Sequence, residues 1–425
     1  MIFTFIMLKP KTIIHLTNGQ AARIVSLLGQ GGQGEVYIAE VNGRQMALKW
    51  YTHPDYITNN VFYRNLETNI RMGKPSDSFL WPEMLTLPEY GSFGYLMPLR
   101  PKRFVDFSKF LLAKVRFQSF DALFHAAIQI CEAFKSLHIK GLSYQDLNDG
   151  NFFIDPNNGD VLICDNDNVI FSGANLGIAG KTRYMAPEVV AGQHPDTYSD
   201  RFSLTIILFL LLYGNHPFEG EKVLAQPCMR ESDERRFFGS EMIFIYDPQD
   251  DTNRPLSRLH TNVIRRWEAL PQCLREQFVV EFSRDKLYTN PQSRLIEAEW
   301  VRLLQSAQTL LITCPHCREQ VFMQKSSDER CGACGRVIQV KAKLTVEGRT
   351  LPLIVGNHYE LLEGLCFDAV LSSTDNLLWL RNTSNFTWQV TTTKGEQRSL
   401  APQALMPAKP GIQIQFNNNL KGEIN

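Results

Sequence analysis

Two short segments of the chain combine aspartate and asparagine at a spacing that suits phosphoryl-transfer chemistry. Asp146 is followed five residues later by Asn151, and Asp165 lies 19 residues after Asp146. Carboxylate and amide oxygens are the ligands that a hard Mg²⁺ ion accepts, so Asn151 and Asp165 can hold the metal while Asp146 accepts a hydroxyl proton. An Asp and an Asn at this spacing are common by chance, so the prediction depends on the rest of the sequence.

A glycine-rich segment near the start of the chain can approach phosphate groups. Gly29, Gly31 and Gly34 follow an apolar run and precede two β-prone segments, at 36–39 and 46–50. Glycines allow the backbone N–H groups of a loop to lie against phosphate oxygens. A glycine hairpin without a ligand is the alternative. Because this loop joins strands instead of opening a helix, we predict a lid over a nucleotide rather than a dinucleotide-binding turn.

Lys49 ends the second of these strand patterns and is the candidate phosphate-binding cation. A helix is predicted at 60–72, and Glu67 on it is the expected partner of Lys49. The inward positions of this helix are expected to be Val61, Phe62, Leu66 and Ile70. The alternatives are a surface lysine on an edge strand and a solvated glutamate.

With these elements in order, the chain resembles the eukaryotic-type (Hanks-type) Ser/Thr protein kinases. The matching segments are 29–34, Lys49, Glu67, 144–151, 165–167, the Tyr-Met-Ala-Pro-Glu run at 184–188, 200–204 and 291–294. The resemblance implies an α+β fold of two lobes with ATP and Mg (or Mn) between them. It implies a hinge at 93–99, where Met97 is expected to contact the nucleotide, and a pair between Arg294 and Glu188.

Three positions depart from the family pattern. His-Arg-Asp is replaced by Tyr144-Gln145-Asp146, Asp-Phe-Gly by Asp165-Asn166-Asp167, and the lysine two residues after the catalytic Asp by Asn148. Loss of that lysine removes a charge that would stabilise the transferring phosphoryl group, and Lys181 of the activation segment is a candidate substitute. Asp167 is either a second carboxylate near the metal or a solvated loop acid. A polar Asn166 must find a partner or water, so we expect weaker switching of this segment.

Gln145 bears on how the enzyme is controlled. In the family an arginine at this position binds a phosphorylated activation loop through charge-assisted hydrogen bonds, which a neutral Gln145 cannot make. We therefore predict a non-RD protein serine/threonine kinase that does not require activation-loop phosphorylation. The alternatives are a pseudokinase scaffold that binds nucleotide and protein partners, and a small-molecule kinase, which the Ala-Pro-Glu segment disfavours.

The tail carries two C-x₂-C knuckles. Cys314 and Cys317 are followed by Cys331 and Cys334, a spacing typical of a tetrahedral Zn²⁺ site of the zinc-ribbon kind. Disulfides are the alternative, which the reducing compartment expected of an ATP-using kinase disfavours. His316 lies within a knuckle and is not expected to be a ligand, because four thiolates already close the site.

The last part of the chain predicts a small all-β domain. Strands are expected at 378–382, 387–390 and 412–416, the last with a period-two alternation. Residues 384–388 faintly resemble the second half of a forkhead-associated domain, although the residues that would grip a phosphate are not found. We expect a β-sandwich for protein contacts.

The whole chain divides, on these patterns, into a kinase domain at 17–305 (lobes 17–98 and 99–305), a zinc ribbon at 310–340 and a β domain at 341–425. Its 44 basic and 44 acidic residues give no support for nucleic-acid binding. We find no convincing signal peptide or membrane span, and expect a cytoplasmic protein. The combination is similar to bacterial kinases of tellurite-resistance-associated clusters, which implies a metal-dependent phosphatase and a von Willebrand type A protein as partners.

Overall fold

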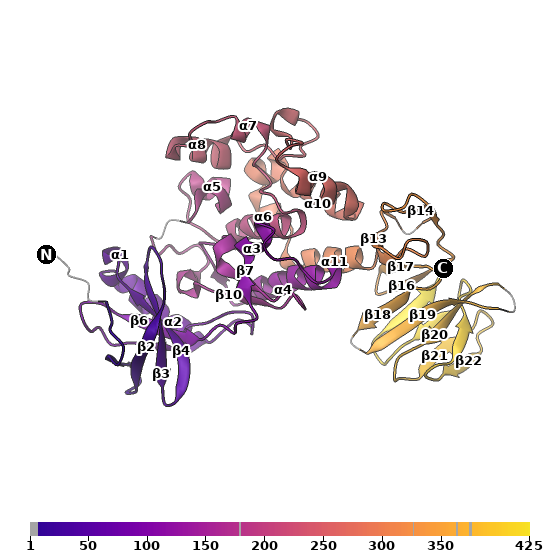
Figure 1. The fold of residues 1–425 in the computed structure, drawn as a ribbon, viewed down its shortest axis with the longest axis horizontal. Helices are drawn as coiled ribbons and strands as arrows, with labels where there is room; N and C mark the ends of the chain where they lie inside the picture. The colour runs from indigo at the N-terminus through magenta and orange to yellow at the C-terminus, as the bar shows by residue number, and fades with distance from the viewer. Residues whose placement is uncertain (1–6, 178–179, 326, 363, 374–375) are drawn as a thin grey trace. The chain divides into compact units, whose positions relative to one another are not determined.

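The computed structural model describes residues 7–177, 180–325, 327–362, 364–373 and 376–425 (Figure 1). They form two compact units. The first consists of Met1–Asn262 and Val279–Val301, and the second of Val263–Phe278 and Arg302–Asn425. The second unit therefore includes an internal segment that the sequence did not link to the tail.

The first unit begins with a six-stranded antiparallel sheet, in the order β1-β2-β3-β4-β6-β5, with α2 beside it (Figure 1). Its strands are β1 (Ile13–His15), β2 (Ala21–Gln30), β3 (Gly34–Val41), β4 (Arg44–Tyr51), β5 (Met84–Leu85) and β6 (Gly94–Pro98). Helix α2 (Asn60–Met72) begins where the side chain of Asn59 accepts hydrogen bonds from two backbone N–H groups. This sheet and helix are the predicted small lobe.

Gly34 is required by packing between strands. It lies opposite Tyr51 in the β3–β4 pair, and a Cβ at this position would come within 2.1 Å of the carbonyl oxygen of Trp50. Gly29 and Gly31 instead face open space. The glycine-rich loop therefore joins two strands, as predicted, and leaves room beside its first two glycines.

The remainder of the first unit is mostly helical. Its central helix α6 (Thr197–Tyr213) is buried along almost its whole length, which explains its continuous apolar sequence. Asp196 caps its first turn and Gly214, with a φ of 74°, ends it. The other helices of the chain are α1 (Pro54–Ile57), α3 (Phe107–Leu111), α4 (Phe120–Ile139), α5 (Pro187–Val190), α7 (Glu221–Leu224), α8 (Glu231–Arg235), α9 (Thr261–Ala269), α10 (Gln272–Glu281) and α11 (Glu297–Gln308).

Short strands and short helical turns make up the rest of the first unit, including the loops of the predicted site. The strands are β7 (Val105–Asp106), β8 (Leu142–Ser143), β9 (Phe152–Ile154), β10 (Val161–Ile163) and β11 (Ile170–Phe171). The turns are η1 (Asp149–Asn151), η2 (Asn166–Asn168), η3 (Thr182–Tyr184), η4 (Arg236–Ser240), η5 (Asp251–Asn253), η6 (Asp285–Thr289) and η7 (Pro291–Ser293). The antiparallel β9–β10 hairpin lies between the two segments that bear the predicted metal ligands.

The second unit contains two small strand pairs followed by an all-β region. The pairs are β12 (Leu311–Thr313) with β13 (Gln320–Phe322) and β14 (Glu329–Arg330) with β15 (Val337–Ile338). The all-β region comprises β16 (Ala342–Val346), β17 (Arg349–Leu353), β18 (His358–Leu362), β19 (Leu365–Leu371), β20 (Leu378–Asn382), β21 (Trp388–Thr391), β22 (Gln397–Leu400), β23 (Leu405–Pro407), β24 (Gln413–Gln415) and β25 (Lys421–Ile424).

These last strands form two sheets around one core. The sheet orders are β17-β16-β25-β24-β21-β22 and β18-β19-β20-β23. Trp388 is fully buried in the core, with its ring against those of Phe367 and Phe416. The strands predicted at 378–382, 387–390 and 412–416 correspond to β20, β21 and β24. Among the residues described, no helix is both long and apolar enough to cross a membrane.

Candidate active site

Lys49 lies on β4 with its ammonium group enclosed by polar partners. Its Nζ atom is 2.8 Å from Asp167 Oδ2, 3.2 Å from Asp165 Oδ1 and 2.5 Å from Gln33 Oε1. Only 6% of the side chain is exposed. Burial lowers the pKa of Lys49, but the negative charges of Asp165 and Asp167 outweigh it and hold the pKa well above its ordinary value. Lys49 therefore stays charged where it lies.

Asp167 is the innermost acid of this group. Its side chain is fully buried, and its Oδ2 atom also accepts a hydrogen bond of 2.6 Å from the hydroxyl of Tyr51. Tyr51 is itself buried among aromatic rings, including that of Phe62 on α2. Of the two interpretations given for Asp167 from the sequence, the solvated loop acid is wrong. The residue instead anchors the lysine.

Glu67 is not brought to Lys49. Helix α2 turns Phe62, Asn65, Leu66 and Asn69 inward, and Glu67 is exposed on the other side. The predicted pair with Lys49 is therefore not formed, because Asp165 and Asp167 occupy the ammonium group. The predicted inward face was right at Phe62 and Leu66 and wrong at Val61, which is 60% exposed.

Neutral amides connect α2 to the segment that follows Asp165. The side chains of Asn65 and Asn69 both donate to the carbonyl oxygen of Val169, at 2.7 and 2.8 Å. Asn166 is fully buried and donates to the carbonyl oxygens of Leu80 and Ile163. The amide nitrogen of the residue that replaces the family's aromatic has thus found backbone partners, whereas its Oδ1 atom is buried without a hydrogen-bond partner among the described residues.

Asn151 and Asp165 are held close by backbone and side-chain bonds. Asn151 is buried, its side-chain oxygen accepts from the N–H of Asn148 at 2.7 Å, and its carbonyl oxygen accepts from the N–H of Cys164 at 2.9 Å. Asp165, next to Cys164, adopts a left-handed φ of 56° and leaves 42% of its side chain exposed. Two oxygen-bearing side chains, one on each side of this connection, fit the hard-ligand requirement of Mg²⁺.

Asp146, the predicted base, is partly withdrawn from water. Burial raises its pKa to about 6, although hydrogen bonds from the backbone of Lys181 and the side chain of Asn148 lower it. The Nδ2 atom of Asn148 lies 3.2 Å from Asp146 Oδ1, and the Nζ atom of Lys181 lies 2.8 Å from Asn148 Oδ1. An acid with such a pKa is ionised at neutral pH and still basic enough to accept a proton.

Asp200 of α6 binds the backbone of the loop that carries Asp146. The carboxylate of Asp200 accepts hydrogen bonds from the backbone N–H groups of Tyr144 and Gln145, at 2.6 and 3.3 Å. Gln145 adopts a left-handed φ of 68°, and its side-chain amide donates to the carbonyl oxygen of Ala174 at 2.6 Å. Where the family's arginine would bind a phosphate, this glutamine binds a backbone carbonyl instead.

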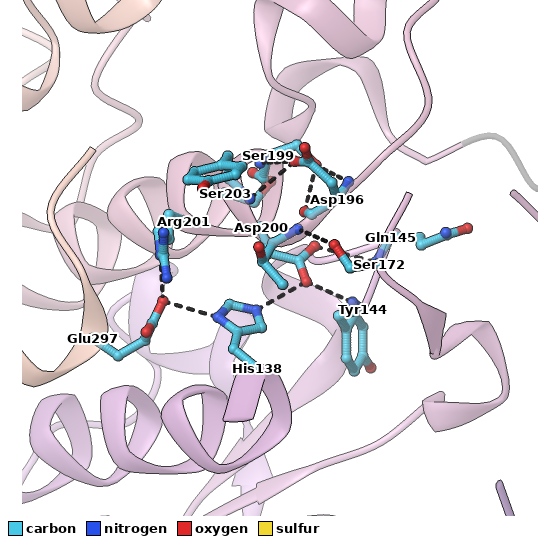
Figure 2. A network of polar contacts seen from close by, with 12 residues as sticks. His138, Tyr144, Gln145, Ser172, Asp196, Ser199, Asp200, Arg201, Ser203 and Glu297 are labelled. Carbon is cyan, nitrogen blue, oxygen red and sulfur yellow. Dashed lines mark hydrogen bonds and ion pairs between the residues drawn. The ribbon is translucent and has the colours of Figure 1, made fainter. Parts of the chain in front are cut away.

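His138 supports Asp200, as Figure 2 shows. Its ring nitrogens lie 3.2 Å from Asp200 Oδ2 and 2.9 Å from Glu297 Oε1, and Glu297 also accepts a hydrogen bond of 2.8 Å from Arg201. Burial lowers the pKa of His138, but its bonds to the two carboxylates outweigh it and raise the pKa to about 9. The sequence analysis missed His138 and Glu297, because residues 159 positions apart share no local pattern.

Three further residues were predicted from the sequence: Arg294, Glu188 and Met97. Arg294 and Glu188 form the expected pair, with two N–O distances of 2.6 and 2.9 Å. Met97 is buried on β6, opposite Ala47 in the neighbouring strand.

The four predicted cysteines of the tail form one cluster. The sulfur atoms of Cys314, Cys317, Cys331 and Cys334 all lie within 4.8 Å of one another, and two pairs are 3.9 Å apart. Tetrahedral Zn²⁺ with bonds of about 2.3 Å would place sulfurs roughly 3.8 Å apart, so the set fits the metal. None of the four cysteines forms a disulfide. The ring of His316 has a partner of its own, since its Nε2 atom lies 3.0 Å from the carbonyl oxygen of Val337.

Comparison with known proteins places this site in a family. The protein kinase domain family matches residues 22–300. Protein kinase C delta type of Rattus norvegicus is 28% identical over 203 residues, which cover 46% of this chain and 29% of that protein. Serine/threonine-protein kinase PrkC of Bacillus subtilis is 25% identical over 212 residues, or 48% and 32% of the two chains. The aligned part thus spans less than a third of these relatives.

Proposed function

Because more than half of it matches the protein kinase domain, the chain belongs to this family, and we propose that it transfers the γ-phosphoryl group of ATP to Ser or Thr side chains of proteins. The observation that carries the proposal is the joint arrangement of Lys49, Asp146, Asn151 and Asp165. Lys49 is buried beside two carboxylates, and burial raises the pKa of Asp146. Asn151 and Asp165 bring an amide and a carboxylate oxygen to neighbouring segments. The similarity to serine/threonine-protein kinase PrkC supports the choice of acceptor.

Each residue has a distinct task in this proposal. Gly29 and Gly31 leave space for the phosphates, Lys49 binds their oxygens, and Asn151 and Asp165 hold Mg²⁺, which neutralises charge on the phosphates when bound. Asp146 orients the acceptor hydroxyl and takes its proton while the bond from phosphorus to the leaving ADP oxygen breaks. The pKa of about 6 leaves Asp146 ready for this at neutral pH.

We further propose that activity does not require phosphorylation of the activation segment. The bond from the Gln145 side chain to Ala174 supports this, because it holds the segment without a phosphate. Changing Ser172→Ala, Thr182→Ala and Tyr184→Phe together should leave the transfer rate within about threefold of wild type. A collapse of the rate in a protein that still unfolds cooperatively would contradict the proposal.

For the tail, we propose that the four cysteines bind a structural Zn²⁺ ion. The closed set of four thiols leaves no open position for catalysis. The all-β region would then contact protein partners, for which a metal-dependent phosphatase and a von Willebrand type A protein are the first candidates on the resemblance given above.

The experiment that tests the main proposal is phosphosite mapping. Wild-type protein and the Asp146→Asn variant are incubated with ATP, Mg²⁺ and each candidate partner or a generic protein substrate. We expect phosphoserine or phosphothreonine with the wild type only. Nucleotide binding without any transfer by the wild type would favour the scaffold alternative.

A further inference from the structure

Lys181 reaches the catalytic loop at the place where the loop itself lacks a cation. Its Nζ atom lies 2.8 Å from Asn148 Oδ1 and 3.7 Å from Asp149 Oδ1. Asn148 is the position at which the family pattern has a lysine. The ammonium group therefore comes from residue 181, more than 30 positions away in the sequence, to the side chain that replaces that lysine.

The same residue is tied to the base. The backbone N–H of Lys181 donates to the carboxyl group of Asp146, and Asn148, which holds the ammonium group, also donates to Asp146 Oδ1 at 3.2 Å. Backbone and side chain of Lys181 thus both converge on the atoms around the proton acceptor.

The surroundings of Lys181 leave its charge available. Its side chain is 58% exposed, its nearest partner is a neutral amide, and the carboxylate of Asp149 lies further off, at 3.7 Å. Gly150 lies beside this pair, since a Cβ there would be tight against Asn148 Oδ1 at 3.1 Å and in ordinary contact with the Nζ atom of Lys181 at 3.6 Å. An exposed cation whose carboxylate partner is 3.7 Å away can still stabilise an anion that develops during a reaction.

We propose that Lys181 is a catalytic residue whose ammonium group stabilises the transferring phosphoryl group in place of the missing loop lysine. The inference rests on the proposed phosphoryl transfer. In that step the bond from phosphorus to the ADP oxygen breaks, the bond to the acceptor oxygen forms, and the hydroxyl proton passes to Asp146. Lys181 supplies charge and hydrogen bonds and transfers no proton.

The test moves the lysine from position 181 to position 148 in two steps. Lys181→Gln should lower kcat about 100- to 1,000-fold with the KM for ATP changed less than threefold, since the residue acts on the transition state. Adding Asn148→Lys to that variant should raise its kcat by at least tenfold. Lys114→Gln, at an exposed lysine of the loop after α3, is the matched control and should behave as wild type.

A second measurement needs no turnover. Lys181→Gln should weaken binding of ADP with aluminium fluoride and Mg²⁺, which imitates the phosphoryl group in transfer, and leave the affinity for ADP alone unchanged. Thermal unfolding of each variant reports on the fold. An active wild type whose Lys181→Gln variant keeps its rate, or keeps its affinity for the fluoride complex, would overturn the inference and leave the proposed function intact. A wild type that transfers no phosphate would instead overturn the proposed function.

Discussion

Lys49 and Lys181 are two lysines of the same unit in opposite surroundings. The side chain of Lys49 is 6% exposed and contacts two carboxylates, whereas that of Lys181 is 58% exposed, contacts a neutral amide and lies 3.7 Å from one carboxylate. At low dielectric the buried pairs are strong and fix the position of the cation, while the exposed ammonium keeps its charge for another anion. The contrast indicates that its carboxylate partners hold Lys49 in one place, whereas the ammonium group of Lys181 is exposed enough to take another anionic partner.

The largest effect should come from removing the inner acid. Asp167→Asn takes the fully buried charge from Lys49, which costs roughly 3–5 kcal/mol when one partner of a buried pair is lost. We expect a lower free energy of unfolding of the nucleotide-free protein, measured by urea denaturation, and weaker ATP binding. Glu67→Gln is the matched control, since Glu67 is exposed on α2. A larger loss of stability in Glu67→Gln than in Asp167→Asn would show that Glu67 of α2 is the partner of Lys49.

The next largest effect concerns the support beneath the catalytic loop. His138 has a pKa raised from 6.5 to about 9, so the folded protein holds this proton more tightly than the unfolded chain. The stabilisation is therefore complete below pH 6.5 and is lost as the pH rises through 9, with a size of about 3 kcal/mol. His138→Gln should be less stable than wild type at pH 6 and should converge with it above pH 9. A constant difference across this range would contradict the assignment.

A smaller effect is expected from the titration of Asp146. Its pKa is raised to about 6, and the base acts only when it is ionised. Lowering the pH from 8 to 5 protonates roughly nine-tenths of it, so kcat/KM should fall about tenfold. A rate that is flat across this range, at constant nucleotide occupancy, would remove Asp146 from the role of base.

The smallest effect on transfer should come from the tail cluster. Cys317→Ser is expected to lower the zinc content of the purified protein, measured by mass spectrometry, because one of four ligands is lost. The transfer rate should stay within about twofold of wild type, since no cysteine of the cluster belongs to the first unit. Unchanged metal content in the variant would count against a four-thiolate site.

Sequence motifs predicted those parts of the site whose residues lie close together in the chain. The two C-x₂-C knuckles follow from their spacing, Asp146 and Asn151 from their spacing together with the ordered motifs around them, and the strand at 412–416 from its alternation. The partner of Lys49 could not be obtained this way, because Asp167 lies 118 residues further along the chain. A signal was present at Asn65 and Asn69, whose i, i+4 spacing puts two amides on the inner face of α2 and leaves Glu67 outside it.

The most direct test of the account is the rate of a single turnover with wild type and Asp146→Asn at saturating ATP and Mg²⁺, with nucleotide affinity measured on the same samples. We predict transfer to Ser or Thr by the wild type, a rate about 100- to 10,000-fold lower in the variant, and equal nucleotide affinity. Equal rates in the two proteins, or nucleotide binding without transfer in the wild type, would contradict it.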